Sequence, residues 1–314
     1  MNDSTAPTTI PHHIKGSKTY YQMCRGTKLI FEEVYHPGNL KDSDYVNKDL
    51  LMDRLREIAR QTMREELVKV IDLYFNRGSI AYIISDLDHN VIGLSISEAS
   101  FDNGNQVILP WLNIYLEEYR EKGVYIICVT KSIIHFINEY QVINNLKGIM
   151  KMIPLFKKWV FISRTFNPRI YCSMLRPNMN VSPKFDNTGR IKKINVPKDE
   201  REIRTNFLKK LGYKNDEIND RSLFVIKAFS NEKENREMHE NFPLSSDDSV
   251  NKFFKNHLGL DNGNLLVSTA TFRPVVLVPM DKLKKQLKKT SRFLKMRKPV
   301  FTSPESETAT EVQR

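Results

Sequence analysis

A short stretch near the middle of the chain gathers polar side chains that could bind or transform a substrate: Ser163, Arg164, Thr165, Asn167 and Tyr171. Residues 159–162, just before it, are aromatic or aliphatic, which predicts a buried strand. Asn167 followed by Pro168 is typical of a helix N-terminus, because asparagine caps the first turn and proline needs no amide partner there. Open α/β sheets bind ligands at the carboxyl ends of their strands. The sequence therefore predicts an active site at this strand-to-helix junction.

Arg164, the absence of three common motifs and the two N-terminal histidines bear on which reactions the protein could catalyse. Arg164 could hold a carboxylate or phosphate through two parallel hydrogen bonds, or it could form an ordinary ion pair. The sequence contains no Gly-x-Ser-x-Gly, Walker-loop or Cys-x-x-Cys motif. It therefore offers no motif that would support a hydrolase, a nucleotidase or a redox protein. His12 and His13 lie in a polar N-terminal segment without a partner cluster, and we expect no metal site.

The spacing of apolar residues indicates the elements that position this junction. It predicts strands at 27–35, 80–85, 91–97, 124–130, 159–162, 222–229 and 264–270. It predicts helices at 51–74 (one helix or two), 111–119 and 142–153, from Asn167, at 203–211, and around Phe253 and Phe254. This order indicates a mixed α/β protein.

The composition is ordinary for a soluble globular protein, with 40% hydrophobic and 27% charged residues among 314. No apolar run reaches the length of about 18 residues that a transmembrane helix needs. Cys24, Cys128 and Cys172 show neither a disulfide framework nor a zinc-binding pattern, which favours a reducing compartment. We therefore expect a cytoplasmic protein, either free or peripheral to a membrane.

Positive charge is concentrated near the C-terminus. The net charge is +12, and nine lysines and arginines without an acid lie between Lys282 and Lys298. Leu283, Leu287 and Leu294 would share one face of a helix in this segment, so residues 276–314 are expected to form a basic amphipathic helix and tail. The helix could bind an anionic membrane surface, could bind nucleic acid, or could pack on the body as a solvated helix.

The order of the predicted elements resembles the GCN5-related N-acyltransferase superfamily over residues 29–272. The hairpin at 80–97 is similar to the family's second and third strands, and residues 161–171 are similar to its fifth strand and the helix after it. Residues 177–220 and 230–263 would then be insertions. The resemblance implies a mixed, mostly antiparallel twisted sheet flanked by helices, in one domain of residues 20–275 that follows a disordered tail of residues 1–19.

The resemblance also implies a coenzyme A site. The family's cofactor loop contains a basic residue or glutamine, two residues, a glycine, one residue, and a glycine or alanine. Backbone amides at a helix N-terminus bind the pyrophosphate there. The corresponding segment after the predicted strand 124–130 is residues 144–150, which assigns cofactor binding to Asn145, Lys147 and Gly148.

The resemblance assigns two further roles: Asn167 would also contact the cofactor, and Tyr171 would protonate the leaving thiolate. In an acyl transfer a base must also remove the proton of the amine, and Glu98, at the end of the hairpin, is the carboxylate best placed for this by the order of the elements. Arg164, at a strand end, would bind the acceptor.

The resulting hypothesis is an N-acyltransferase. It would move an acyl group from acyl-coenzyme A or an acylated carrier protein to a small-molecule amine or an amino acid. Two alternatives stay open. A non-catalytic binding protein of the same fold would explain why Gly148 is the only glycine in segment 144–150. A protein that binds nucleic acid or a membrane surface through Lys282 to Lys298 would explain the basic C-terminus.

Overall fold

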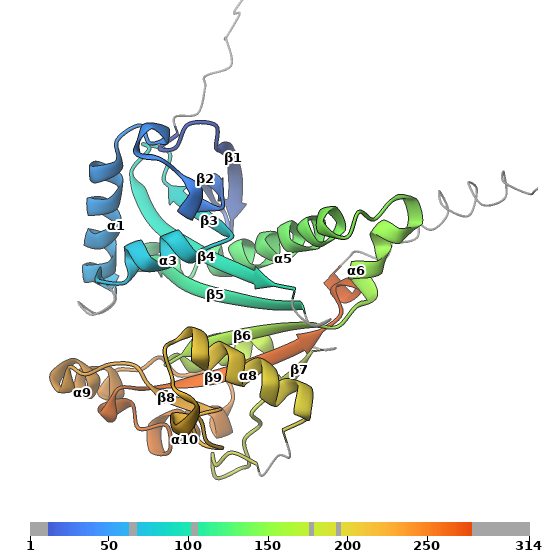
Figure 1. Ribbon diagram of the computed structural model, residues 1–314. Helices are drawn as coiled ribbons and strands as arrows, with labels where there is room; N and C mark the ends of the chain where they lie inside the picture. Colours follow the sequence, from blue (N-terminus) through green and yellow to red (C-terminus); the bar gives the residue numbers. More distant parts are fainter. Residues whose placement is uncertain (1–11, 63–67, 102–105, 176–178, 193–195, 278–314) are drawn as a thin grey trace, which may run out of the picture.

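A nine-stranded sheet forms the centre of the protein (Figure 1). The computed structural model describes residues 12–62, 68–101, 106–175, 179–192 and 196–277. The strands are β1 (Lys18–Cys24), β2 (Thr27–Tyr35), β3 (Ile80–Ser85), β4 (Val91–Ser100), β5 (Gln106–Tyr115), β6 (Trp159–Thr165), β7 (Asn180–Ser182), β8 (Val225–Lys227) and β9 (Asn264–Phe272). Their order is β1-β2-β3-β4-β5-β6-β9-β7, and β8 also pairs with β9. The expected mixed, mostly antiparallel sheet flanked by helices is confirmed.

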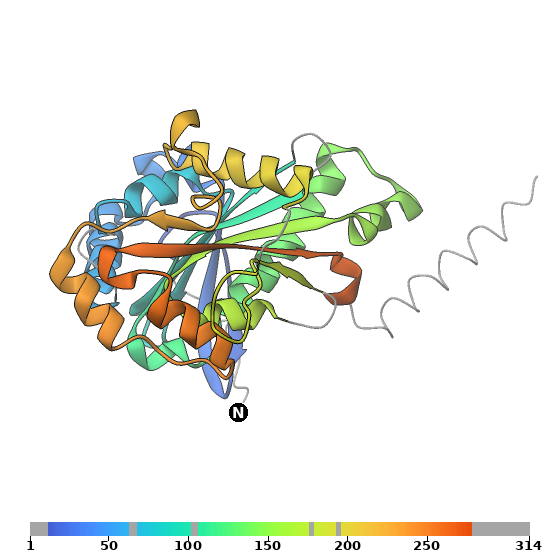
Figure 2. The same cartoon turned by 90° about the horizontal axis from the view of Figure 1, so that it is seen from below.

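Helices cover both faces of the sheet (Figures 1 and 2). One face packs against α1 (Lys48–Thr62), α3 (Ile71–Arg77) and α8 (Lys198–Lys210). The other packs against α5 (Val124–Ile143), α7 (Pro168–Met174) and α10 (Asp248–Asn256). The remaining α-helices are α4 (Glu117–Arg120), α6 (Ile153–Phe156) and α9 (Glu232–Glu240). Short 3₁₀ turns are η1 (Pro37–Asn39), η2 (Asp42–Asp44), η4 (Gly148–Met152), η5 (Asn215–Glu217), η6 (Leu260–Asn262) and η7 (Pro274–Leu277).

The two halves of the sheet meet at the single parallel pair, β5 with β6. The register joins Gln106 to Trp159, Val107 to Val160 and Ile108 to Phe161 and goes no further. Beyond these residues the strands diverge (Figure 1). On its other side β5 carries a bulge, because Ile96 pairs with Leu112 while Ser97 pairs with Pro110, which leaves Trp111 as an extra residue. The bulge and the short pairing therefore lie next to each other.

Three predicted elements were wrong. Residues 124–130 belong to α5, although their β-branched and aromatic composition favours a strand. The helix forms because Val124, Cys128, Phe136 and Tyr140 recur at helical spacing and are buried along one face. Conversely, the helix predicted at 111–119 is mostly strand β5. The helix predicted at 142–153 is replaced by the end of α5, a turn and η4.

Smaller differences concern the ends and the insertions. The helical pattern at 51–74 is two helices, α1 and α3. The expected N-terminal tail of residues 1–19 is too long, since Ile14 is buried and β1 begins at Lys18. The two expected insertions contribute β7, α8, α9 and α10, which belong to the folded body. The predicted basic helix at 280–298 lies outside the described residues, within which no helix is long and apolar enough to cross a bilayer.

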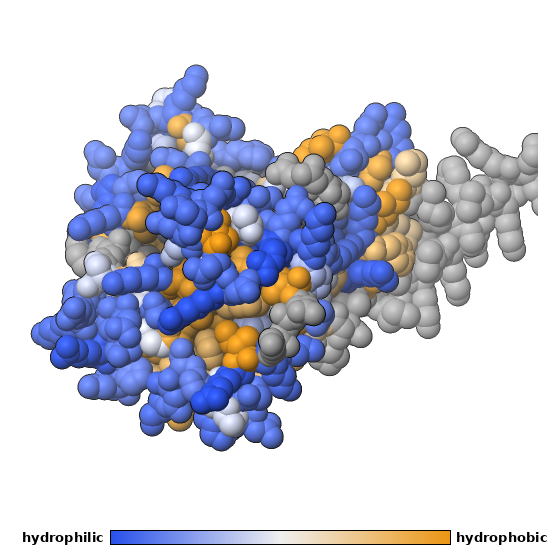
Figure 3. Space-filling view, turned by 60° about the horizontal axis from the view of Figure 1, so that its bottom comes forward, coloured by the Kyte–Doolittle hydropathy of each residue, from blue (hydrophilic) through white to orange (hydrophobic). Residues whose placement is uncertain are grey.

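A hairpin projects from the body at the C-terminal end of α5 (Figures 1 and 2). It consists of the last turns of α5, a turn at residues 144–147, η4 and α6. Hydrophobic side chains gather on this part of the surface (Figure 3).

Arg204 of α8 is a buried cation that ties together the C-terminal half of the sheet. Its guanidinium donates to the carbonyl oxygens of three residues and to two side chains, at 2.7 to 3.0 Å: Ser182, Leu223, Val267, Thr269 and Glu200. All five N–H groups of the guanidinium thus have an acceptor. The contacts join α8 to β7, to β9 and to the chain leading into β8.

We expect Arg204→Met to lower the free energy of unfolding by about 3–5 kcal/mol, because Glu200 and three buried carbonyl groups would lose their donor. Arg201→Met is the matched control on the same helix. Its exposed ion pair with Asp220 contributes no more than about 1 kcal/mol. Urea unfolding of the full chain measures both, and equal effects would contradict a special role for Arg204.

Candidate functional site

The N-terminus of α5 presents backbone amides that have no acceptor. The helix follows β5 and the short helix α4, and it begins after Gly123, whose φ of 77° is the left-handed conformation that favours glycine. Within the part of the chain that the structure describes, the amides of Val124, Tyr125 and Ile126 have no hydrogen-bond acceptor. No acid lies in this first turn. Such a helix end attracts anions, because its amides and its dipole both favour negative charge.

Cationic side chains surround this helix end. The Arg25 guanidinium donates to the carbonyl oxygen of Glu121 at 2.9 Å, and its side chain lies beside Gly123. Arg169, in the first turn of α7, pairs with the Glu121 carboxylate at 3.3 Å. Arg120 and Lys122 come from the preceding turn. Glu121 thus contacts Arg25 through its carbonyl oxygen and Arg169 through its carboxylate, while two further acids, Glu117 and Glu118, lie in the preceding helix α4.

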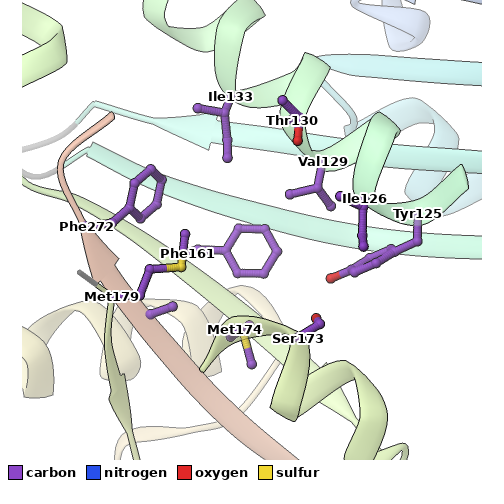
Figure 4. A pocket seen from close by; sticks show the side chains of 11 residues that line it. Tyr125, Ile126, Val129, Thr130, Ile133, Phe161, Ser173, Met174, Met179 and Phe272 are labelled. Carbon is purple, nitrogen blue, oxygen red and sulfur yellow. The ribbon is translucent and has the colours of Figure 1, made fainter. Parts of the chain in front are cut away.

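An apolar pocket of about 60 Å³ lies beside this helix end (Figure 4). Side chains of α5 form one wall, and side chains of β6, α7 and β9 form the other. Figure 4 shows Tyr125 reaching from α5 towards α7, with Phe161 between the two walls. Its lining consists of Tyr125, Ile126, Val129, Thr130, Ile133, Phe161, Ser173, Met174, Met179, Ala270 and Phe272. Such a lining suits a flexible apolar chain better than a charged group.

The predicted junction after β6 lies next to this pocket, but Tyr171 does not line it. Asn167 is confirmed as the N-cap of α7, because its Oδ1 accepts a hydrogen bond from the Arg169 amide at 2.9 Å. Tyr171 is buried, its ring packs on Phe185, and its hydroxyl donates to the Pro183 carbonyl oxygen. Burial raises the pKa of Tyr171. Its neighbours on α7, Ser173 and Met174, face the pocket instead.

Glu98 and Arg164 lie together on the opposite face of the sheet, on either side of Trp111. Glu98 accepts hydrogen bonds from the Trp111 indole at 2.7 Å and from Lys210 at 2.5 Å. Arg164 donates to the Trp111 carbonyl oxygen and to the Tyr74 hydroxyl, both at 3.2 Å. Its guanidinium also lies over both rings. Arg164 therefore reaches across the diverging strands to the bulged residue of β5.

Asn145, Lys147 and Gly148 lie far along the chain from the start of α5. They are exposed residues in the projecting hairpin, where Asn145 and Gly148 have positive φ values of 48° and 55°. This segment ends a helix instead of beginning one after a strand, so it lacks the geometry expected of a cofactor loop. The expected spacing of a basic residue, two residues and a glycine occurs at Arg120 and Gly123. The predicted strand at 124–130 concealed it.

The cysteines and metal ligands offer no alternative centre. Burial raises the pKa of Cys128 to about 12, which leaves it a neutral thiol at physiological pH. The pKa values of Cys24 and Cys172 are also raised by burial. Among the described residues, no group of three or more histidines, cysteines and acids could hold a metal ion.

We expect Tyr171→Phe to lower the free energy of unfolding by about 1–3 kcal/mol, because the buried Pro183 carbonyl would lose its hydrogen-bond donor. Tyr21→Phe, at a half-exposed tyrosine on β1, is the control and should change stability little. Urea unfolding tests both variants. An unchanged midpoint for Tyr171→Phe would show that its hydroxyl is not held in this way.

No protein-family model matches the chain, and no curated protein matches its sequence significantly. Any function must therefore be argued from the two sides of the sheet: the amides, cations and apolar pocket around α5, and the Glu98, Trp111 and Arg164 cluster opposite.

Proposed function

We propose that the protein transfers an acyl group from an acyl-thioester donor, coenzyme A being the first candidate, to an amine. One observation carries the proposal. A parallel strand pair diverges after three residues, and α5, which follows β5 and α4, begins beside an apolar pocket with three amides that have no acceptor among the described residues. A donor that combines a pyrophosphate with an apolar arm would match both features.

The fit can be followed from the helix end into the pocket. The amides of residues 124–126, with Arg25 and Arg169 nearby, would hold the pyrophosphate. The apolar pocket between α5 and α7, whose volume is about 60 Å³, would hold a short apolar part of the donor such as its acyl group. Tyr125 stands where the family pattern has a glycine or alanine, and it makes one wall of the pocket. When bound, acyl-coenzyme A supplies an activated carbonyl carbon.

The acceptor would approach from the face that carries Glu98 and Arg164. In the reaction the amine nitrogen bonds to the carbonyl carbon, the C–S bond breaks, and the amine loses a proton while the thiolate gains one. Glu98 is the proposed base, and Arg164 the proposed contact for an anionic group of the acceptor. For the acid, Tyr125 is a stronger candidate than Tyr171, because Tyr125 lines the pocket whereas the Tyr171 hydroxyl donates to the Pro183 carbonyl oxygen.

Donor binding can be tested by calorimetric titration with coenzyme A, acetyl-coenzyme A and a long-chain acyl-coenzyme A. Gly123→Asp should weaken binding roughly tenfold or more, because a carboxylate would repel the pyrophosphate and compete for the amides. Gly148→Asp, at the other positive-φ glycine considered for this role, should leave binding unchanged. The reverse result would return the site to residues 144–150, and no binding to the unchanged protein would refute a coenzyme A donor.

Turnover can be tested by release of free coenzyme A in the presence of a panel of amines and amino acids. We expect Glu98→Gln to lower kcat about a hundredfold with little change in donor affinity, since only the proton acceptor is lost. Lys210→Gln removes the same ion pair but keeps the carboxylate, and it should cost much less. Donor binding without turnover for any amine would instead support a non-catalytic binding protein.

A further inference from the structure

The projecting hairpin at the end of α5 exposes an unusual number of large apolar side chains in a short segment. Their exposed fractions are 78% for Val142, 60% for Ile143, 50% for Met150, 38% for Ile153 and 51% for Phe156. Single exposed apolar residues are normal, but a cluster on a projecting element indicates a contact surface. The hairpin lies at the end of α5 opposite its N-terminus (Figure 1), and none of its residues lines the pocket. Its apolar tip therefore needs an explanation other than donor binding.

The charge around this tip has one sign. Between Tyr140 and Lys158 the chain contains four lysines and no acid. Lys158 pairs with Asp199, and Lys157 lies over the Tyr140 ring. Lys147 and Lys151 are exposed and form no ion pair with any residue that the structure describes. Two lysines are thus available beside the apolar side chains.

The described part of the chain ends close to the hairpin. The last described element, η7, contacts α6, and the description ends at Leu277. The nine basic residues between Lys282 and Lys298 follow shortly afterwards in the sequence. The chain therefore leaves the described structure beside the hairpin, and its positive charge begins within a few residues of that point.

We propose that residues 142–156 insert into the surface of a bilayer that contains anionic phospholipids. The apolar side chains enter the boundary between headgroups and acyl chains, while Lys147 and Lys151 contact lipid phosphates. Charge complementarity favours this partner over a second copy of the chain, which would place lysines against lysines. The proposal does not depend on acyl transfer, because it uses none of the donor-site residues.

The test is flotation of the full-length protein with vesicles of phosphatidylcholine alone or mixed with phosphatidylserine. We expect binding to the mixed vesicles only. Ile143→Asp and Phe156→Asp should each lower the partition coefficient about tenfold. Lys147→Glu together with Lys151→Glu should lower it further and reduce its salt dependence. Leu50→Asp and Leu244→Asp are matched controls, with exposed fractions of 68% and 61% elsewhere on the surface, and should bind like the unchanged protein.

Several outcomes would overturn the proposal. One is an absence of vesicle binding. Another is binding that survives Ile143→Asp and Phe156→Asp but is lost on deletion of residues 282–314, which would assign the membrane contact to the tail alone. A third is a dimer in solution that these two variants dissociate, with no effect on vesicles. Urea unfolding of each variant ensures that a loss of binding is not a loss of fold.

Discussion

The parallel pairing of β5 with β6 is the constraint on which the rest of the structure depends. Among the described residues, three pairs of backbone partners join the antiparallel strands β1–β5 to the strands around β9. Because the two strands run in the same direction and then diverge, the helices that follow them begin on the same side of the sheet. The α5 N-terminus, the Asn167 cap of α7 and the apolar pocket therefore have one geometric origin.

Where the strands diverge, side chains on one face of the sheet connect β4, β5 and β6. At the bulge, the indole of Trp111 donates a hydrogen bond to Glu98, and the carbonyl oxygen of Trp111 accepts one from Arg164 on the neighbouring strand β6. The guanidinium thus provides a hydrogen bond at a position where strand pairing has already ended. Arg204 has a comparable role in the C-terminal half of the sheet. It donates hydrogen bonds to the carbonyl oxygens of Ser182, Leu223 and Val267, near the points where β7 and β8 pair with β9. The half-buried Arg164 and the buried Arg204 thus supply hydrogen bonds where strand pairing ends.

Local patterns predicted much of the fold because they depend on neighbouring residues. The hairpin of β3 and β4, the buried strand β6 and the Asn167–Pro168 helix start all have strong local signals. Strand β5 was misread because the bulge interrupts its alternation, so that Leu109, Trp111, Leu112 and Ile114 all face one core. Helix α5 was misread because its β-branched residues favour a strand until tertiary packing is considered.

In the candidate site, too, the residues could be predicted from local patterns but their arrangement in space could not. The polar residues after β6 could be recognised from sequence, as could Arg164 and Glu98 individually. Their arrangement could not, because Glu98 meets Arg164 only through Trp111 on another strand, and Tyr171 turns towards Pro183 instead of the pocket. The start of α5 could have been predicted as the anion site, since Arg120 and Gly123 have the spacing of a basic residue, two residues and a glycine.

The position of β9 has a consequence for synthesis of the chain. Strands β1 to β5 follow one another in sequence and in the sheet, so this half can assemble as it leaves the ribosome. In contrast, β6, β7 and β8 all pair with β9, which is made last. Until β9 has been synthesised, one edge of β6 has no partner strand, and only three of its residues pair with β5 at the other edge. The C-terminal half of the sheet therefore stays incompletely paired until residues 264–272 have been synthesised.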